Sequence, residues 1–322
     1  MHVIRHLHLN LLVFGSIAAL GSCQGNPVSP DDMMTDAGSD AGDPSVDSGP
    51  GSMPGTDSGP GTPPPPPPPP GTAVNSGNVL FVGHSLINWD MPKMMAALAT
   101  DADRDHSWDA QIGLGGSIQL QWERSAAGVN ARDALATGNY DVLVMTEAIP
   151  LESHYQWSGS VEYAGNFYAL AQQHRPGTRV FMYETWHETD EPNWRGRIDT
   201  DRALWERIID EVNAANEGPD MEMIPAGTAL GQLVDRIAAG GVPGLTSRDQ
   251  LFDDNIHMTD LGNYFVACVQ FATIYRMSPV GLTARTVNEF DTPYDTPSPE
   301  AARLMQEVAW EVVSADARAG VR

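Results

Sequence analysis

Apolar and polar positions alternate along the chain in blocks that predict strands and helices in turn. Short apolar runs, typical of strands buried on both faces of a parallel sheet, stand at 79–82, 108–114, 140–145, 179–184 and 221–225. Segments with helical periodicity stand between and after these runs, at 91–99, 118–127, 161–174, 200–216, 230–239, 263–275 and 299–313. This alternation predicts an α/β fold built on a parallel sheet.

The first quarter of the chain has a different composition, which divides the sequence into three regions. Residues 23–77 consist mainly of Asp, Ser, Gly, Pro, Thr and Ala, and Pro63 to Pro70 is an unbroken proline run. Such a segment cannot bury enough apolar surface to offset its conformational entropy, so we expect a disordered linker that serves as a spacer. We therefore expect a signal peptide in residues 1–22, the linker in 23–77 and a folded domain in 78–315.

Residues 1–22 have the features of an export signal. Arg5 lies in a short polar beginning, and the apolar stretch 9–20 is too short to span a bilayer comfortably. The sequence LGSC at 20–23 resembles the lipobox of bacterial lipoproteins, which implies acylation of Cys23 and a lipid anchor in the bacterial cell envelope. Gln24 replaces the aspartate that favours inner-membrane retention, so the outer membrane or cell surface is expected. The alternative is an ordinary signal peptide with a coincidental cysteine.

Charge and cysteine content exclude two classes of protein. The formal charge of −24 argues against nucleic-acid binding, because no basic patch is available to neutralise phosphates. The chain has 2 cysteines, too few for a disulfide scaffold. Cys268 lies within the apolar helix predicted at 263–275, so we expect a buried free thiol there.

Polar residues at two points of the predicted sheet are candidates for catalysis. Ser85 follows the first strand, and open α/β folds place their ligands at the carboxyl ends of strands. His257 stands three residues after Asp254, in the loop that enters the 263–275 helix. A neighbouring carboxylate can orient an imidazole and hold it in one tautomer, so that the ring accepts the proton of a serine nucleophile. We predict that Ser85, His257 and Asp254 are nucleophile, base and orienting acid.

These residues stand in segments that resemble the blocks of the SGNH, or GDSL-type, hydrolase superfamily. GHSL at 83–86 stands where the family has Gly-Asp-Ser-Leu, GLGG at 113–116 matches the second block, and DNIH at 254–257 matches the fifth. The resemblance covers nearly all of residues 78–313. It implies a three-layer α/β/α sandwich, similar to flavodoxin, with five parallel strands in the order 2-1-3-4-5.

The same resemblance implies an oxyanion hole. Its donors would be the backbone N–H groups of Ser85 and of a glycine in the second block, with Gly116 preferred and Gly115 as the second choice. In the family, a third donor comes from the asparagine of a Gly-x-Asn in the third block. Residues 145–150 read MTEAIP and contain no asparagine, so Thr146 is the better candidate for this donor.

Two residues near the site raise separate questions. An ionised Glu147 facing a developing oxyanion would repel it, so we expect its side chain to be protonated, turned away or in contact with substrate. His84 replaces the aspartate of the first block, which is not a triad member, so altered support of the turn is expected rather than loss of chemistry. Some SGNH branches with Gly-Gly-x-x-Leu in the second block also lack the asparagine, and residues 115–120 resemble theirs.

The substrate is less well defined by the sequence. Trp186 and His187 follow the fourth predicted strand, and Trp157 and Trp194 lie nearby in the sequence. Exposed tryptophans beside carboxylates suit stacking on sugar rings, but these side chains can equally cover the core beneath long loops. His187 and Glu188 could suggest a metal site, but no second histidine stands at ligand spacing. We expect no metal and no cofactor.

Taken together, these features predict a lipid-anchored serine esterase. Its substrate would be a small acyl ester, with an O-acetyl group on a carbohydrate as one candidate. Two alternatives remain open at the level of sequence: a catalytically impaired surface domain that binds glycans, and an acyltransferase that uses the same three residues.

Overall fold

The structure is a computed structural model that describes residues 71–322. The predicted signal peptide, Cys23 and most of the linker lie outside the described residues. The described part begins shortly before the first strand and continues beyond residue 315, where Ala319 is fully buried and the Arg318 carbonyl accepts a hydrogen bond from Met223 N–H.

The centre of the domain is a sheet of six strands in the order β3-β2-β1-β4-β5-β6. Five of them pair in parallel, and β3 pairs antiparallel with β2 at the edge. The strands are β1 (Ser76–Gly83), β2 (Asp105–Ile112), β3 (Ala127–Gly128), β4 (Val142–Met145), β5 (Arg179–Tyr183) and β6 (Glu222–Ile224). The five parallel strands have the order 2-1-3-4-5 among themselves, so the predicted topology is confirmed.

The apolar runs form this sheet because both of its faces are covered. In β1, residues 79–82 are fully buried, but they face opposite sides. Val79 and Phe81 pack into one hydrophobic cluster, whereas Leu80 and Val82 pack into a second cluster on the other face. A strand between two cores needs apolar residues at consecutive positions, which explains the lack of alternation in the sequence.

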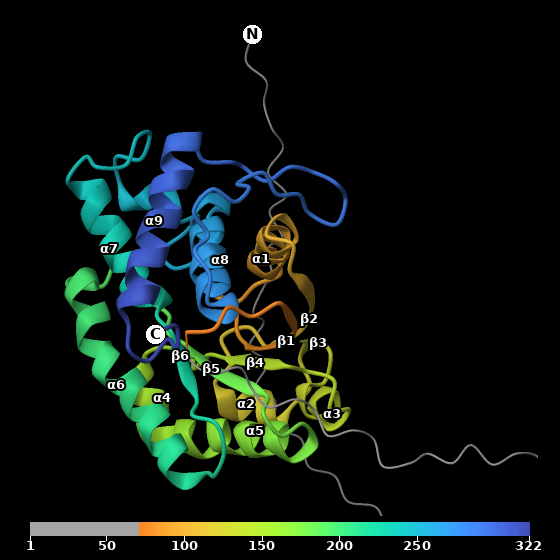
Figure 1. Ribbon diagram of the computed structural model, residues 1–322. Helices are drawn as coiled ribbons and strands as arrows, with labels where there is room; N and C mark the ends of the chain where they lie inside the picture. Colours follow the sequence, from red (N-terminus) through yellow and green to blue (C-terminus); the bar gives the residue numbers. More distant parts are fainter. Residues whose placement is uncertain (1–70) are drawn as a thin grey trace, which may run out of the picture. The chain divides into compact units, whose positions relative to one another are not determined.

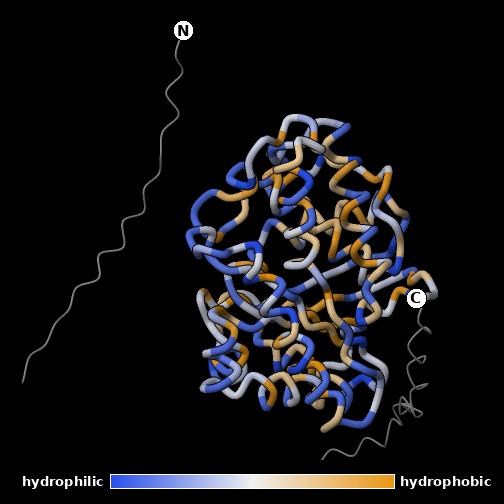
Figure 2. The backbone as a smooth tube through the Cα atoms, turned by 90° about the vertical axis from the view of Figure 1, so that its left-hand side faces the viewer, coloured by the Kyte–Doolittle hydropathy of each residue, from blue (hydrophilic) through white to orange (hydrophobic). Residues whose placement is uncertain are grey.

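Helices form a layer on each side of the sheet (Figure 1). One face is covered by α1 (Asp90–Asp101), α7 (Ala226–Ala238), α8 (Asp260–Tyr275) and α9 (Pro299–Ala315). The other face is covered by α2 (Ile118–Glu123), α3 (Ala131–Ala136), α4 (Leu151–Trp157), α5 (Ser160–His174) and most of α6 (Trp194–Ala215). Figure 2 shows hydrophobic and hydrophilic stretches alternating along the helices, as expected where one side of each helix meets the core. The predicted α/β/α sandwich is confirmed.

The region after the second predicted strand differs from the sequence prediction. The helix expected at 118–127 ends at Glu123, because the next residues turn back and Ala127 pairs with Ile112 of β2. Gly128 adopts φ +96°, and a Cβ atom there would lie 1.9 Å from the Ala110 carbonyl oxygen, so only glycine fits this edge. The short helix α3 then begins at Ala131 and is capped by Asn130, whose side chain accepts hydrogen bonds from two backbone N–H groups of the first turn.

Helix α8 carries the predicted cysteine in the core. Cys268 is fully buried and is a free thiol, as the sequence predicted. Burial raises the pKa of this thiol to about 12, which keeps it protonated and unreactive. Within residues 71–322, none of the helices combines the length and apolar character that crossing a membrane requires.

Candidate active site

The turn after β1 presents Ser85 at the carboxyl edge of the sheet. Gly83 ends the strand at a point with no room for a side chain. A Cβ atom there would lie 2.6 Å from Cγ2 of Thr146 and 2.8 Å from Cδ1 of Ile87. The turn is closed by a hydrogen bond of 3.0 Å from Ile87 N–H to the His84 carbonyl. Ser85 is therefore held in a tight connection between β1 and α1.

His84 supports this turn from below. Its ring is buried, Nδ1 accepts a hydrogen bond from Leu86 N–H at 3.4 Å, and Nε2 lies 3.0 Å from the Glu147 carbonyl oxygen. The proton must be on Nε2, which donates to the carbonyl. Burial lowers the pKa of His84 to about 4, so the ring is neutral at ordinary pH. It links the Ser85 turn to the end of β4, as expected for altered support of the turn.

The loop before α8 holds Asp254 and His257 in a fixed relation. Oδ1 of Asp254 accepts hydrogen bonds of 2.7 Å from the backbone N–H groups of Ile256 and His257. Asp253 N–H donates to the His257 carbonyl at 2.9 Å, which closes the loop. Thr259 then caps α8 by accepting from Gly262 N–H.

The fold brings these two loops together, although 172 positions separate Ser85 from His257. Ser85 Oγ lies 2.9 Å from Nε2 of His257, and Nδ1 of His257 lies 2.7 Å from Oδ2 of Asp254. Because an ionised carboxylate only accepts hydrogen bonds, Nδ1 carries the proton and Nε2 is free to accept the serine proton. Burial opposes ionisation of Asp254, but the hydrogen bonds from the His257 ring and from two backbone N–H groups outweigh it and lower its pKa.

The second block does not place its glycines as first expected. The N–H of Gly116, the preferred oxyanion donor, is already donated to the Gly113 carbonyl at 2.9 Å. Gly115 instead lines the cavity beside Ser85, with φ +61° and no atom within 4 Å of the point that a Cβ atom would occupy. The backbone at Gly115, the second choice, is therefore the better placed of the two.

Thr146 and Glu147 of the third block do not line the cavity, contrary to expectation. Thr146 is fully buried, and its hydroxyl donates to the Glu147 carbonyl at 3.4 Å, which argues against its assignment as an oxyanion donor. Glu147 is also fully buried, so it cannot be a substrate contact. Its Oε1 accepts hydrogen bonds from Ile118 N–H at 3.1 Å and from Ala148 N–H at 2.7 Å. Burial raises the pKa of this carboxyl, and the side chain is turned away from the cavity.

Two of the three tryptophans considered for sugar stacking are core residues, whereas the third, Trp157, is 83% exposed. Trp186 and Trp194 are 1% and 2% exposed, and their indole N–H groups donate to the carbonyls of Ile256 and His187, respectively, both at 2.9 Å. His187 is buried, and its Nε2 is hydrogen-bonded to Asp201. The assignment of Trp186 and His187 as substrate contacts is wrong for this reason, and the alternative that the tryptophans cover the core holds for both Trp186 and Trp194.

A cavity of about 480 Å³ lies over Ser85 and His257. Its walls are largely apolar, formed by Leu86, Leu114, Ala148, Ile149 and Ile256. His257 and Asp254 remain open to solvent, with side chains 45% and 52% exposed. A nucleophile, a base and an accessible apolar cavity thus occur together at one edge of the sheet, which is the arrangement that acyl transfer requires.

Comparison with known proteins shows a likeness in structure. No protein-family model matches the sequence, and no curated protein matches it. A DUF4886 family protein from Bacteroides uniformis is similar, with 18% identity and a TM-score of 0.52 over 74% of this chain and 95% of that chain. Identity this low shows a shared fold only.

Two further solved structures are less similar. They are a family 3 carbohydrate esterase from Clostridium thermocellum (14% identity, TM-score 0.40, 61% of this chain and 94% of that chain) and a protein from Parabacteroides merdae described as a GDSL-like lipase (16% identity, TM-score 0.41, 62% and 96%). The architecture of this chain agrees with the one that the resemblance to SGNH hydrolases implied.

One acidic residue of the cavity was not among the predicted site residues. Glu188 lines the same cavity as Ser85 and His257, and in the sequence it is conspicuous only because it follows His187. Its place in the loop that follows the fourth parallel strand, β5, was the available signal, since loops at that end of every strand meet at one edge.

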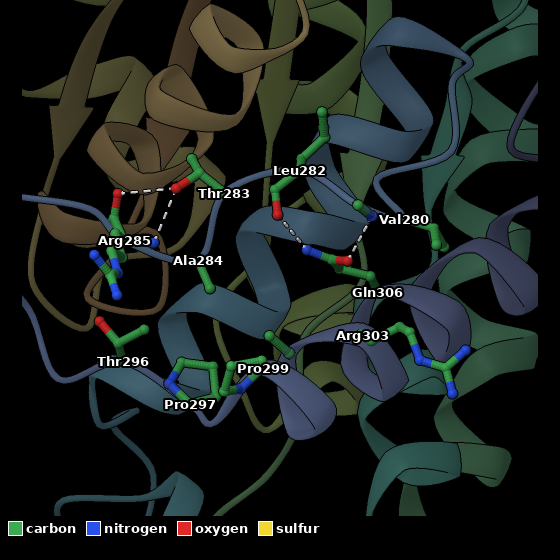
Figure 3. A pocket seen from close by; sticks show the side chains of 12 residues that line it. Val280, Leu282, Thr283, Ala284, Arg285, Thr296, Pro297, Pro299, Arg303 and Gln306 are labelled. Carbon is green, nitrogen blue, oxygen red and sulfur yellow. Dashed lines mark hydrogen bonds between the residues drawn. The ribbon is translucent and has the colours of Figure 1, made fainter.

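A second cavity, of about 410 Å³, lies between residues 280–285 and the start of α9 (Figure 3). Gln306 braces its wall: Oε1 accepts from Gly281 N–H at 2.9 Å, and Nε2 donates to the Leu282 carbonyl at 2.8 Å and to the Tyr264 hydroxyl at 2.7 Å. Its lining residues include no serine, histidine or carboxylate. The cavity over Ser85 is therefore the candidate active site.

Proposed function

We propose that this chain is a serine esterase of the SGNH type that hydrolyses a small acyl ester. The observation that carries the proposal is the hydrogen-bonded series from Ser85 through His257 to Asp254, at 2.9 and 2.7 Å. A glycan-binding domain that had lost its activity would have no need to keep these three side chains aligned.

In the first half of the reaction, Ser85 Oγ attacks the ester carbonyl carbon while its proton passes to Nε2 of His257. Asp254 stabilises the imidazolium that forms, and the backbone N–H groups of Ser85 and Gly115 receive the oxyanion. His257 then gives the proton to the departing alcohol oxygen, and the acyl group stays on Ser85.

In the second half, His257 takes a proton from water, and the resulting hydroxide attacks the acyl-enzyme carbonyl. The carbon–oxygen bond to Ser85 breaks, the serine recovers its proton from His257, and a carboxylic acid leaves. The exposure of His257 and Asp254 gives water free access to the base, which favours hydrolysis over transfer to a sugar.

The lack of the third-block asparagine, which would be a third oxyanion donor, is expected to lower the turnover rate. Removal of one oxyanion donor typically lowers turnover by roughly 10²–10³-fold. We therefore expect a slower enzyme than one with three donors, acting on an ester whose acyl group is small enough for a cavity of about 480 Å³. An O-acetyl group on a carbohydrate meets this condition, and the predicted lipid anchor at Cys23 would place the enzyme at the cell envelope.

The test is hydrolysis of p-nitrophenyl acetate by the protein and by its Ser85→Ala variant. Release of p-nitrophenol should fall by several orders of magnitude in the variant, while circular dichroism and thermal unfolding stay at wild-type values. Equal rates for the two proteins, or no turnover by the folded wild type, would refute the proposed function.

A further inference from the structure

The candidate active site contains a carboxylate that has no part in the triad. Glu188 lines the cavity with Ser85 and His257, and its side chain is 43% exposed. Outside the catalytic residues and His84, the rest of the cavity is lined by apolar side chains and by Gly115. A charged acceptor within an apolar surface distinguishes strongly between ligands. Ligands that donate a hydrogen bond to it bind more tightly, whereas ligands without a donor leave the carboxylate desolvated and unpaired and bind more weakly.

The position of Glu188 is tied to that of the catalytic base. On one side of it, Trp186 Nε1 donates to the Ile256 carbonyl at 2.9 Å, and on the other, Thr189 N–H donates to the Asn255 carbonyl at 2.5 Å. Both acceptors come directly before His257 in the sequence. The loop after β5 is thus fastened on both sides of Glu188 to the loop that carries His257.

A buried, hydrogen-bonded histidine stands beside the carboxylate. Nδ1 of His187 lies 3.9 Å from Oε2 of Glu188, and Nε2 of His187 is hydrogen-bonded to Asp201, which Arg197 also contacts at 2.9 Å. His187 and Asp201 are both buried. The residue before Glu188 is therefore held in place, which fixes the backbone from which the Glu188 side chain projects.

The mechanism tells which part of a substrate lies near Glu188. His257 must protonate the departing alcohol oxygen, so the alcohol part leaves on the His257 side of Ser85, whereas the carbonyl oxygen points to Gly115. Because the loop of Glu188 is fastened to the residues next to His257, Glu188 faces the alcohol part rather than the acyl part.

We propose that Glu188 is the specificity-determining residue for the alcohol part and that it selects polyols with free hydroxyl groups near the ester. The proposal rests on the proposed esterase function and names the substrate class for that site. Hydroxyl groups of a sugar donate to the carboxylate, and a hydrocarbon alcohol leaves it without a partner. The same charge, on a protein with a formal charge of −24, disfavours anionic alcohols such as uronates.

The experiment compares two acetate esters that differ only in hydroxyl groups and ring oxygen: 6-O-acetylglucose and cyclohexylmethyl acetate. The readout is the ratio of their kcat/KM values, measured as acetic acid released by the wild type and by Glu188→Ala and Glu188→Gln. Glu191→Ala is the matched control, because Glu191 lies exposed on the same loop and does not line the cavity.

The ratio should fall roughly 10- to 100-fold in Glu188→Ala, the value of hydrogen bonds to a charged group. Glu188→Gln, which keeps a neutral acceptor, should give an intermediate value, and Glu191→Ala should match the wild type. An unchanged ratio in Glu188→Ala, or an equal loss with both esters, overturns the role of Glu188 but leaves the esterase proposal standing. Absence of Ser85-dependent turnover of p-nitrophenyl acetate overturns both.

Discussion

The buried histidine beside Ser85, His84, makes the fold sensitive to acid, and the size of this effect follows from the structure. Burial lowers the pKa of His84 from 6.5 to about 4; the charges of His154 and His257 add to this, and the hydrogen bond to the Glu147 carbonyl opposes it. In the neutral ring, Nδ1 of His84 accepts a hydrogen bond from Leu86 N–H. Protonation would put a hydrogen on Nδ1 as well, so that two N–H donors would face each other.

The direction in which stability changes with pH follows from the difference in proton binding between the folded and the unfolded chain. Between about pH 6.5 and pH 4 the unfolded chain binds a proton at His84 that the folded chain does not, so stability is present above pH 6.5 and is lost as the pH falls. With these two pKa values, lowering the pH from 7.5 to 4.5 removes about 2.5 kcal/mol of unfolding free energy through His84 alone.

The measurement uses His84→Asn, because the asparagine Oδ1 can accept from Leu86 N–H as Nδ1 does but does not titrate. At pH 7.5 the variant should be less stable by about 1–3 kcal/mol, since the hydrogen bond to Glu147 and part of the packing are lost. Between pH 7.5 and pH 4.5 it should lose about 2.5 kcal/mol less than the wild type in urea unfolding followed by circular dichroism.

A matched control comes from His174, which is exposed at the end of α5. His174→Asn should lose as much stability over this pH range as the wild type does. Equal losses in His84→Asn and the wild type would refute the reasoning, because the buried ring would then not be the group that resists protonation.

Three further predictions concern the proposed orienting acid, a buried carboxyl group and the lipid anchor. Asp254→Asn should lower kcat by at most about 10⁴-fold, less than the roughly 10⁶-fold loss in Ser85→Ala, and an equal loss would contradict an orienting role. Burial raises the pKa of Glu184 to about 7, so its contribution to stability is lost as the pH rises from about 4.5 through 7. From pH 5 to pH 8 the wild type should lose about 2.5 kcal/mol more than Glu184→Gln in urea unfolding, and parallel curves would rule this out. Cys23→Ser should move the protein from the membrane to the soluble fraction after cell disruption; continued membrane association would disprove lipid anchoring.

The fold was predictable because both faces of its sheet are buried. Runs such as 79–82 are apolar at every position, and such runs separated by periodic segments allow few topologies. The short elements were missed for a physical reason. Strand β3 has only two residues, and glycine is required at Gly128 because the Ala110 carbonyl oxygen lies too close for a side chain. Helices α3 and α4 have 6 and 7 residues, too few to show a clear helical period in the sequence.

The meeting of Ser85, His257 and Asp254 was predictable because the chemistry proposed for them requires these residue types in loops at one edge of the sheet. Trp186 and His187 also lie at that edge, yet both point into the core, where Trp186 meets Phe252 edge-on with ring centroids 6.4 Å apart. Sequence order places a residue at the edge of the sheet but does not tell which way its side chain turns. For that reason Glu188, the neighbour that does reach the cavity, was overlooked.

Glu147 explains how the site can be ordered without the asparagine of the third block. A side-chain amide there would give the oxyanion a donor, whereas Glu147 accepts two N–H groups, one from Ile118 at the start of α2 and one from Ala148 after β4. Ile118 comes just after the loop that contains Gly115, so the carboxyl group fixes that loop to the end of β4. In the proposed mechanism, the Gly115 N–H therefore depends for its position on a carboxyl group that does not line the cavity.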